Sequence, residues 1–174
     1  MFPDRLQTAR LLLRPIEFDD AAAIFSNYAQ DPEVCRFVLW RPHADVSETR
    51  AYIAGCLMAT TSRTYVLTRR DTNALVGALD LRDTGPGHIG FGYVLARPVW
   101  RQGLMTEALT ACADWALSQP GIWRFGDVCD AENVASARVM EKAGLQREGL
   151  LRRWGMHPNI SDEPRDCFVY AKVR

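Results

Sequence analysis

The stretch from Tyr93 to Ala108 most constrains what this chain can fold into. It continues an apolar run of strand type, Ile89 to Leu95, and Pro98 then ends the strand because proline has no backbone N–H for a sheet ladder. After Gly103 the apolar residues recur at helical spacing, at Leu104, Met105, Ala108, Leu109, Cys112, Trp115 and Ala116. The stretch therefore predicts a strand, a short polar loop and a helix.

A loop of this kind directs several free backbone N–H groups towards one point. The first N–H groups of a helix have no partner within it, and the helix dipole adds partial positive charge there. An anion, most often a phosphate, is the expected ligand, and Arg101 would strengthen the attraction. An ordinary strand-to-helix turn explains the same residues without a ligand, so the spacing alone leaves both interpretations open.

Two motifs resemble the GNAT acyltransferases, which move an acyl group from acyl-coenzyme A to an amine. Residues 100–109, Trp-Arg-Gln-Gly-Leu-Met-Thr-Glu-Ala-Leu, resemble the pyrophosphate loop of that family. The segment from Asn133 to Gly144 resembles the Asn-x-x-Ser helix of its ribosomal-protein N-terminal acetyltransferase, or Rim-type, branch. The phrase Thr-Ala-Arg-Leu-Leu-Leu-Arg-Pro from Thr8 is also typical of that branch. The resemblance covers roughly residues 6 to 173.

The resemblance implies acetyl-CoA, or another acyl-CoA, as co-substrate, and it implies no metal. The backbone of Val94 and Leu95 would bind the pantetheine arm like an added strand and offer an N–H to the thioester oxygen. The loop that would hold the pyrophosphate comprises Arg101, Gln102, Gly103, Leu104, Met105 and Thr106. A side chain at Gly103 would push the phosphate away from the main chain, which explains the glycine.

Two groups that many GNAT enzymes use are replaced in this sequence. Met140 stands where a tyrosine usually follows the helix-opening asparagine, so Ser136 is the candidate proton donor to the departing thiolate and Asn133 would orient the cofactor arm. Gly90 stands where a glutamate base is frequent. His88 lies on the same strand face, and its ordinary pKa near about 6.5 suits a base. A solvated turn residue is the alternative interpretation of His88.

The acceptor site is less constrained by the sequence. Trp40, in a Trp-Arg-Pro-His loop, and Tyr28 are the candidate acceptor-binding residues, although Trp40 would equally serve as a cap on the core. Without a glutamate base, a weakly basic amine is the easier acceptor. Deprotonation at pH 7 costs about 1.4 kcal/mol for an α-amine and roughly 4.6 kcal/mol for lysine. An α-amine or another weakly basic amine, such as that of a protein N-terminus, is therefore favoured. The alternatives are transfer to a small-molecule amine (antibiotic, polyamine or amino acid), use of succinyl-CoA, and a non-catalytic acyl-CoA-binding module.

The composition sets the remaining limits. A chain of 174 residues with 48% hydrophobic and 24% charged residues is expected to form a single domain, residues 1–174. The net charge of +0 predicts no bulk attraction to nucleic acid or to a membrane. Five scattered cysteines predict reduced thiols in a cytoplasmic protein: Cys35, Cys56, Cys112, Cys129 and Cys167. The sequence leaves the oligomeric state open between a monomer and a homodimer.

The order of the expected elements, β-α-α-β-β-β-α-β-α-β-β, predicts an α+β fold. It matches the GNAT topology, with a mixed, mostly antiparallel central sheet of about seven strands flanked by helices. The expected strands are Arg10–Ile16, Tyr65–Thr68, Leu75–Leu81, Ile89–Leu95, Trp123–Val128, Gln146–Trp154 and Cys167–Val173.

Overall fold

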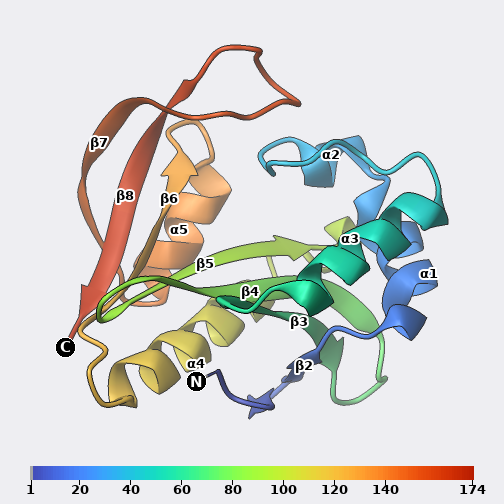
Figure 1. Ribbon diagram of the computed structural model, residues 1–174, viewed down its shortest axis with the longest axis horizontal. Helices are drawn as coiled ribbons and strands as arrows, with labels where there is room; N and C mark the ends of the chain where they lie inside the picture. The colour runs from blue at the N-terminus through green and yellow to red at the C-terminus, as the bar shows by residue number, and fades with distance from the viewer. Residues whose placement is uncertain (1) are drawn as a thin grey trace.

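A mixed eight-stranded sheet forms the centre of the protein (Figure 1). The structure, a computed structural model, describes residues 2–174. The strand order is β1-β2-β3-β4-β5-β6-β8-β7, and of the neighbouring pairs only β5 and β6 run parallel. The strands are β1 (Leu6–Gln7), β2 (Leu11–Pro15), β3 (Ser62–Arg69), β4 (Leu75–Gly85), β5 (His88–Leu95), β6 (Arg124–Asp130), β7 (Gln146–Gly155) and β8 (Arg165–Val173).

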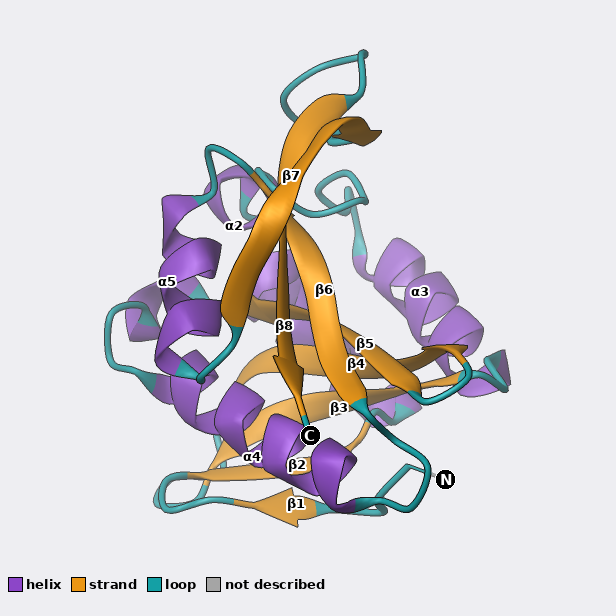
Figure 2. Cartoon of the chain, turned by 90° about the vertical axis from the view of Figure 1, so that its left-hand side faces the viewer, coloured by secondary structure: helices purple, strands orange, loops and turns teal. Residues whose placement is uncertain are grey.

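Helices cover both faces of the sheet. On one face α4 (Leu104–Ser118) and α5 (Val134–Lys142) bury the larger apolar cluster. On the other face α1 (Ala21–Ile24) and α3 (Val46–Met58) bury the smaller one. Figure 2 shows α3 and α5 on opposite sides of the central strands. The short helical elements are η1 (Phe18–Asp20), η2 (Phe25–Ala29), α2 (Pro32–Cys35) and η3 (Arg97–Val99).

None of the helices within residues 2–174 is both long enough and apolar enough to cross a membrane.

Strands β5 and β6 separate soon after they begin. They pair only at His88–Arg124 and Ile89–Phe125. From Gly90 to Leu95, β5 pairs with β4 on one edge and with no strand of residues 2–174 on the other. Figure 1 shows β6 turning away from β5. The sheet is therefore open between these strands, and we call this gap the β5–β6 opening.

The backbone of β5 directs every second N–H group into the β5–β6 opening. Ala96 donates its N–H to a carbonyl of β4 at 2.8 Å, so the even-numbered residues of β5 pair with β4. Phe91 points the other way and donates its N–H to the carboxylate of Asp127 on β6 at 2.9 Å. Tyr93 and Leu95 share the orientation of Phe91, so their N–H groups face the opening.

The predicted α+β class and mostly antiparallel sheet are confirmed, with one strand more than expected. The additional strand is β1, whose two residues pair with Leu12 and Leu13. Two residues cannot display the alternating pattern from which a strand is inferred. Asp45 caps α3, because its side chain accepts hydrogen bonds from the N–H groups of Ser47 and Glu48 at 2.7 and 3.3 Å.

Candidate active site

The segment between β5 and α4 leaves the first N–H groups of α4 without partners in the helix. The first helical bond runs from the Glu107 N–H to the Gly103 carbonyl at 3.1 Å. Gly103 is the N-cap residue, and no side chain of residues 2–174 caps the helix. By contrast, α3 and α5 are capped by Asp45 and Asn133. The amides of residues 103–106 therefore remain free to bind a ligand with acceptor oxygens.

Two residues of this segment have left-handed backbone conformations. The φ of Gly103 is 75°, so glycine stands there because a side chain would strain the backbone. A Cβ at Gly103 would otherwise meet only the Arg10 guanidinium, at 3.6 Å. Arg101 has a φ of 61°, a backbone strain of about 1–2 kcal/mol. Its charged side chain is exposed on the loop.

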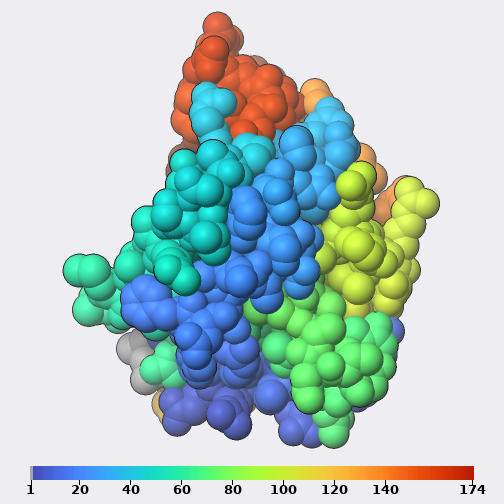
Figure 3. Space-filling view, turned by 90° about the vertical axis from the view of Figure 1, so that its right-hand side faces the viewer, coloured from blue at the N-terminus to red at the C-terminus, as the bar shows by residue number. Residues whose placement is uncertain are grey.

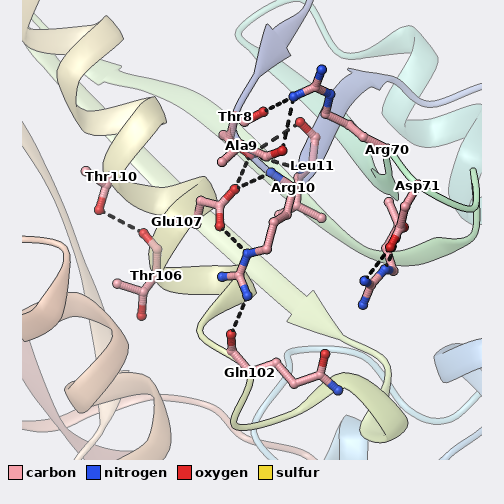
Figure 4. A network of polar contacts seen from close by, with 11 residues as sticks. Thr8, Ala9, Arg10, Leu11, Arg70, Asp71, Gln102, Thr106, Glu107 and Thr110 are labelled. Atoms are coloured by element: carbon pink, nitrogen blue, oxygen red, sulfur yellow. Dashed lines mark hydrogen bonds and ion pairs between the residues drawn. The ribbon is translucent and has the colours of Figure 1, made fainter.

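Glu107 ties the start of α4 to the turn between β1 and β2 (Figure 4). Its carboxylate accepts hydrogen bonds from the Thr8 hydroxyl at 2.6 Å, from the Arg10 backbone N–H at 2.8 Å and from the Arg10 Nε at 2.7 Å. Arg10 also donates Nη1 to the carbonyl of Gln102 at 2.9 Å. Because the peptide unit is planar and trans, fixing the Gln102 carbonyl directs the Gly103 N–H the opposite way. We call this group the Arg10–Glu107 latch.

The two residues predicted to bind the pantetheine arm, Val94 and Leu95, direct their N–H groups to opposite sides of β5. The N–H of Leu95 faces the β5–β6 opening, but the N–H of Val94 faces Ala78 on β4 and belongs to the ladder. The N–H of Tyr93 is the second group that faces the opening. Trp100 donates its indole N–H to the Leu95 carbonyl at 2.8 Å, which fixes the end of the strand.

Ser136 lies in hydrogen-bond contact with Tyr93, a pair that the sequence pattern does not indicate. The Tyr93 hydroxyl lies 2.7 Å from the Ser136 Oγ and 3.2 Å from its carbonyl. Burial raises the pKa of the Tyr93 phenol, so the hydroxyl stays protonated. Asn133 uses its Oδ1 to accept the Ser136 N–H at 3.1 Å, which leaves its Nδ2 for other contacts. Met140 is buried, with 1% of its surface exposed.

His88 lies apart from these residues. It is exposed, is the first residue of β5, and pairs with Arg124 at the closed end of the β5–β6 opening. Leu95 is seven residues further along the strand, roughly 23 Å away at the usual rise. The exposure of His88 and its place at the closed end of the opening fit a solvated turn residue, and a role as the base stays a prediction.

The two predicted acceptor residues differ in burial. Trp40 is half-buried, and its ring lies 5.0 Å from His43 and 6.4 Å from Tyr52 between ring centres. The loop after β7 contacts this segment, because Asn159 donates Nδ2 to the Trp40 carbonyl at 2.8 Å. Figure 3 shows that loop against the residues that precede α3. Tyr28 is only 2% exposed and belongs to the core under α1, not to an open acceptor surface.

Tyr28→Phe is expected to stabilise the protein by about 1 kcal/mol. The Tyr28 hydroxyl is buried without a hydrogen-bond partner in residues 2–174, and an unpaired buried polar group costs about 1–3 kcal/mol. Tyr65→Phe is the matched control, because the Tyr65 hydroxyl donates to the Pro3 carbonyl at 2.5 Å. That variant should lose about 1 kcal/mol. Chemical denaturation measures both; a loss of stability in Tyr28→Phe would show that its hydroxyl has a partner.

A group of charged residues beside two glycines of β5 also escaped the sequence analysis. Arg82 lies between two carboxylates, with Nη1 3.1 Å from Asp80 and Nη2 2.8 Å from Asp127. A Cβ added at Gly90 would come within 2.9 Å of the Asp127 carboxylate, and one at Gly92 within 2.6 Å of the Asp80 carboxylate. The Asp127 carboxylate of β6 and the Thr84 methyl group of β4 therefore occupy the space beside Gly90, where the expected glutamate is missing, and the Asp80 carboxylate of β4 lies beside Gly92.

The fold and this site define an acyltransferase of the GNAT type, with free amides at a helix start next to an opening in the sheet. The Acetyltransferase (GNAT) domain family matches residues 10–146. The chain belongs to this family, and it is an acetyltransferase.

Known proteins resemble the chain over almost its full length. It is 32% identical to the uncharacterized N-acetyltransferase YoaA of Bacillus subtilis, with 100% of this chain and 98% of YoaA covered. The structure of a putative ribosomal-protein-serine acetyltransferase from Vibrio cholerae matches with a TM-score of 0.86 and 26% identity, covering 100% of both chains. RimL, a ribosomal L7/L12 alpha-N-protein acetyltransferase, in complex with coenzyme A shares the fold with a TM-score of 0.85 and 20% identity, covering 97% of both chains.

Proposed function

We propose that this protein transfers an acetyl group from acetyl-CoA to a primary amine by direct attack within a ternary complex. One observation carries the proposal. The uncapped amides of residues 103–106 follow directly from the strand whose free N–H groups face the β5–β6 opening. The uncapped helix amides suit a diphosphate. The free N–H groups of β5 suit an extended, amide-bearing arm that ends in a thioester.

Each part of acetyl-CoA has residues that suit it. The amides of residues 103–106 and the charge of Arg101 would bind the pyrophosphate, with Gln102 in the same loop. The Tyr93 and Leu95 N–H groups would bind the arm and hold the thioester oxygen as negative charge develops. The Asn133 Nδ2 is available to the arm. When bound, acetyl-CoA supplies the activated acyl group.

Glu107→Gln is expected to weaken acetyl-CoA binding about tenfold and to destabilise the protein by about 1–2 kcal/mol. The amide cannot pair ionically with Arg10, so the Gln102 carbonyl and the Gly103 amide lose their fixed orientation. Asp114→Asn is the matched control, because Asp114 pairs with Lys172 on the exposed side of the same helix. Calorimetric titration with acetyl-CoA measures the effect; equal affinities in the two variants would contradict a role for the latch.

The cysteines support direct transfer over an acyl-enzyme. The five cysteines are free, and four of them are buried. Burial raises the pKa of the Cys35, Cys112 and Cys129 thiols to about 12, so they remain protonated at neutral pH. A protonated thiol is a poor nucleophile. An attack by the acceptor amine on the thioester needs no such group.

The acceptor that we favour is the α-amine of a protein N-terminus. An α-amine is deprotonated at the lower cost, about 1.4 kcal/mol at pH 7. The Vibrio cholerae structure, described as a putative ribosomal-protein-serine acetyltransferase, supports this class of acceptor. Trp40, half-buried beside the loop that follows β7, would form part of the acceptor pocket.

A thiol-release assay with a panel of acceptors tests the proposal. We expect turnover with peptides that carry a free N-terminus, and much less with the same peptides after N-terminal blocking, when lysine is the remaining amine. Polyamines and aminoglycosides in the panel would identify a small-molecule enzyme, and succinyl-CoA tests the acyl chain. Tight acetyl-CoA binding without turnover on any amine would refute the proposal and indicate a binding module.

A further inference from the structure

The charged group formed by Asp80, Arg82 and Asp127 beside β5 carries more negative than positive charge. Asp80 and Asp127 share one cation, Arg82, so the group has a net charge of about −1 when both carboxylates are ionised. All three side chains are partly exposed, at 26%, 21% and 38% respectively. An ammonium ion approaching this group would be attracted, which suits an enzyme that acts on amines.

Asp127 is already committed to a structural role. Its Oδ2 accepts the Phe91 N–H at 2.9 Å and the Arg82 Nη2 at 2.8 Å, and its Oδ1 accepts the Val128 N–H at 2.8 Å. It thus supplies the acceptor that β6 would have provided to Phe91 had the two strands stayed paired. Both of its oxygens are therefore occupied by donors from β4, β5 and β6.

Asp80 is far less committed than Asp127. Its carboxylate pairs with Arg82, whose Nη2 donates to Asp127 and to the Phe91 carbonyl instead. The backbone N–H groups of Asp80 and Gly92 also interact with the carboxylate and oppose the rise in its pKa. Burial raises the pKa of Asp80, the charge of Arg82 opposes the rise, and the charge of Asp127 adds to it. A raised pKa makes a carboxylate a stronger base.

Several groups face Asp80 from the elements packed around it. Arg82 lies on its own strand, and Asp127 comes from β6. Tyr52 from α3 lies close enough that the Asp80 carboxylate adds to the rise in the pKa of its phenol, which burial mainly causes. Behind Tyr52 lie the Cys56 thiol and the Tyr28 hydroxyl. Asp80 lies opposite Thr64 of β3 and Gly92 of β5, and Gly92 has no side chain to cover it.

Asp80 also lies on the side from which an acceptor can approach. Ala78 and Asp80 share one face of β4, and Ala78 packs in the cluster under α1 and α3. The 103–106 amides and Ser136 belong to the opposite face, with α4 and α5. Gly92, the cross-strand partner of Asp80, is one residue from Tyr93 and three from Leu95, roughly 3–10 Å along the strand.

From this geometry, and resting on the transferase function proposed above, we propose that Asp80 is the general base that takes the proton from the acceptor amine, directly or through one water. As the amine nitrogen bonds to the acyl carbon, its proton passes to the Asp80 carboxylate. The C–S bond breaks, the electron pair leaves on sulfur, and the thiolate takes up a proton. Asp80 then releases its proton to solvent. The base thus comes from the strand next to the one on which the missing glutamate would stand.

Asp80→Asn tests this assignment with the acceptor that the panel identifies. We expect kcat/KM at pH 7 to fall about 100-fold, since a general base contributes about 10²–10⁴-fold. The deficit should shrink as the pH rises through the pKa of the acceptor, because the amine then arrives deprotonated. The affinity for acetyl-CoA should change less than threefold. Asp83→Asn is the matched control, an exposed aspartate on the same strand that should retain full activity.

The outcomes separate this inference from the proposed function. Wild-type protein without turnover on any amine would refute the transferase function. Wild-type turnover with an unchanged rate in Asp80→Asn, or with a deficit that stays constant from pH 6 to pH 9.5, would refute the role of Asp80 alone. If Asp80→Asn does not fold, as judged by circular dichroism, Asp80→Ser provides the same comparison with a smaller side chain.

Discussion

Gly103→Glu is expected to abolish binding of coenzyme A while the fold survives. The new carboxylate would lie at the entrance of the 103–106 amides, within about 4 Å of a bound phosphate. Two like charges at that distance repel by roughly 4 kcal/mol at an effective dielectric constant of 20, about a thousandfold in affinity. The fold should persist because a Cβ at Gly103 makes an ordinary van der Waals contact with the Arg10 guanidinium, at 3.6 Å, and no closer contact within residues 2–174. Isothermal titration with coenzyme A measures the loss.

Gly103→Asn separates charge from backbone strain. Gly103 has a φ of 75°, and asparagine tolerates that conformation better than other residues with a side chain. This control should therefore bind coenzyme A within about tenfold of the wild type and melt close to it. If Gly103→Glu kept the wild-type affinity, the diphosphate would have to bind elsewhere, and the proposed transferase mechanism would lose its main support.

The predictable part of the site is the part encoded by neighbouring residues. A strand, Pro98, Gly103 and a helical period occur within one stretch, so the loop before α4 follows from the sequence. The sequence explains Gly103 by the space that a phosphate needs, because a pattern of residue types does not show a backbone dihedral angle. The left-handed φ of Gly103 accounts for it without any ligand.

The contacts that could not be predicted from the sequence depend on where β5 and β6 separate. Tyr93 and Ser136 are 43 positions apart, and Arg82 and Asp127 are 45 apart. These pairs meet because β5 and β6 diverge after two residue pairs, and no local periodicity reports that divergence. Gly90 is a residue in the sequence that indicates such a contact. A glycine in a buried strand often marks the close approach of another group, and here the Thr84 methyl and the Asp127 carboxylate approach it.

Tyr28 shows the opposite error, in which a residue type suggested function but its position is structural. A tyrosine on a helical face is equally suited to a pocket and to a core, and only burial distinguishes them. Its 2% exposure assigns it to the core. Trp40 stays a candidate for the acceptor pocket because it is half-buried and lies at a loop contact.

Ser136→Ala is expected to lower kcat about thirtyfold at pH 7 while the affinity for acetyl-CoA changes less than threefold. A thiol pKa of about 8.5 lies roughly 1.5 units above pH 7, so a proton delivered to the leaving sulfur is worth up to about 2 kcal/mol. Ser136 is placed to donate it because its Oγ is 2.7 Å from the Tyr93 hydroxyl, which can replace the lost proton. Steady-state kinetics and titration measure the two quantities.

Tyr93→Phe and the double variant decide whether the two hydroxyls act as one relay. Phenylalanine keeps the ring that stacks on Phe91, 6.0 Å between centroids, and removes only the hydroxyl. In a relay, the double variant should be no slower than Ser136→Ala alone, because the effects of residues that act as a unit are not additive. Raising the pH above 8.5 should shrink the deficit of every variant, since the thiolate can then leave without a proton. Additive losses, or a deficit independent of pH, would assign the Tyr93–Ser136 contact to packing between β5 and α5.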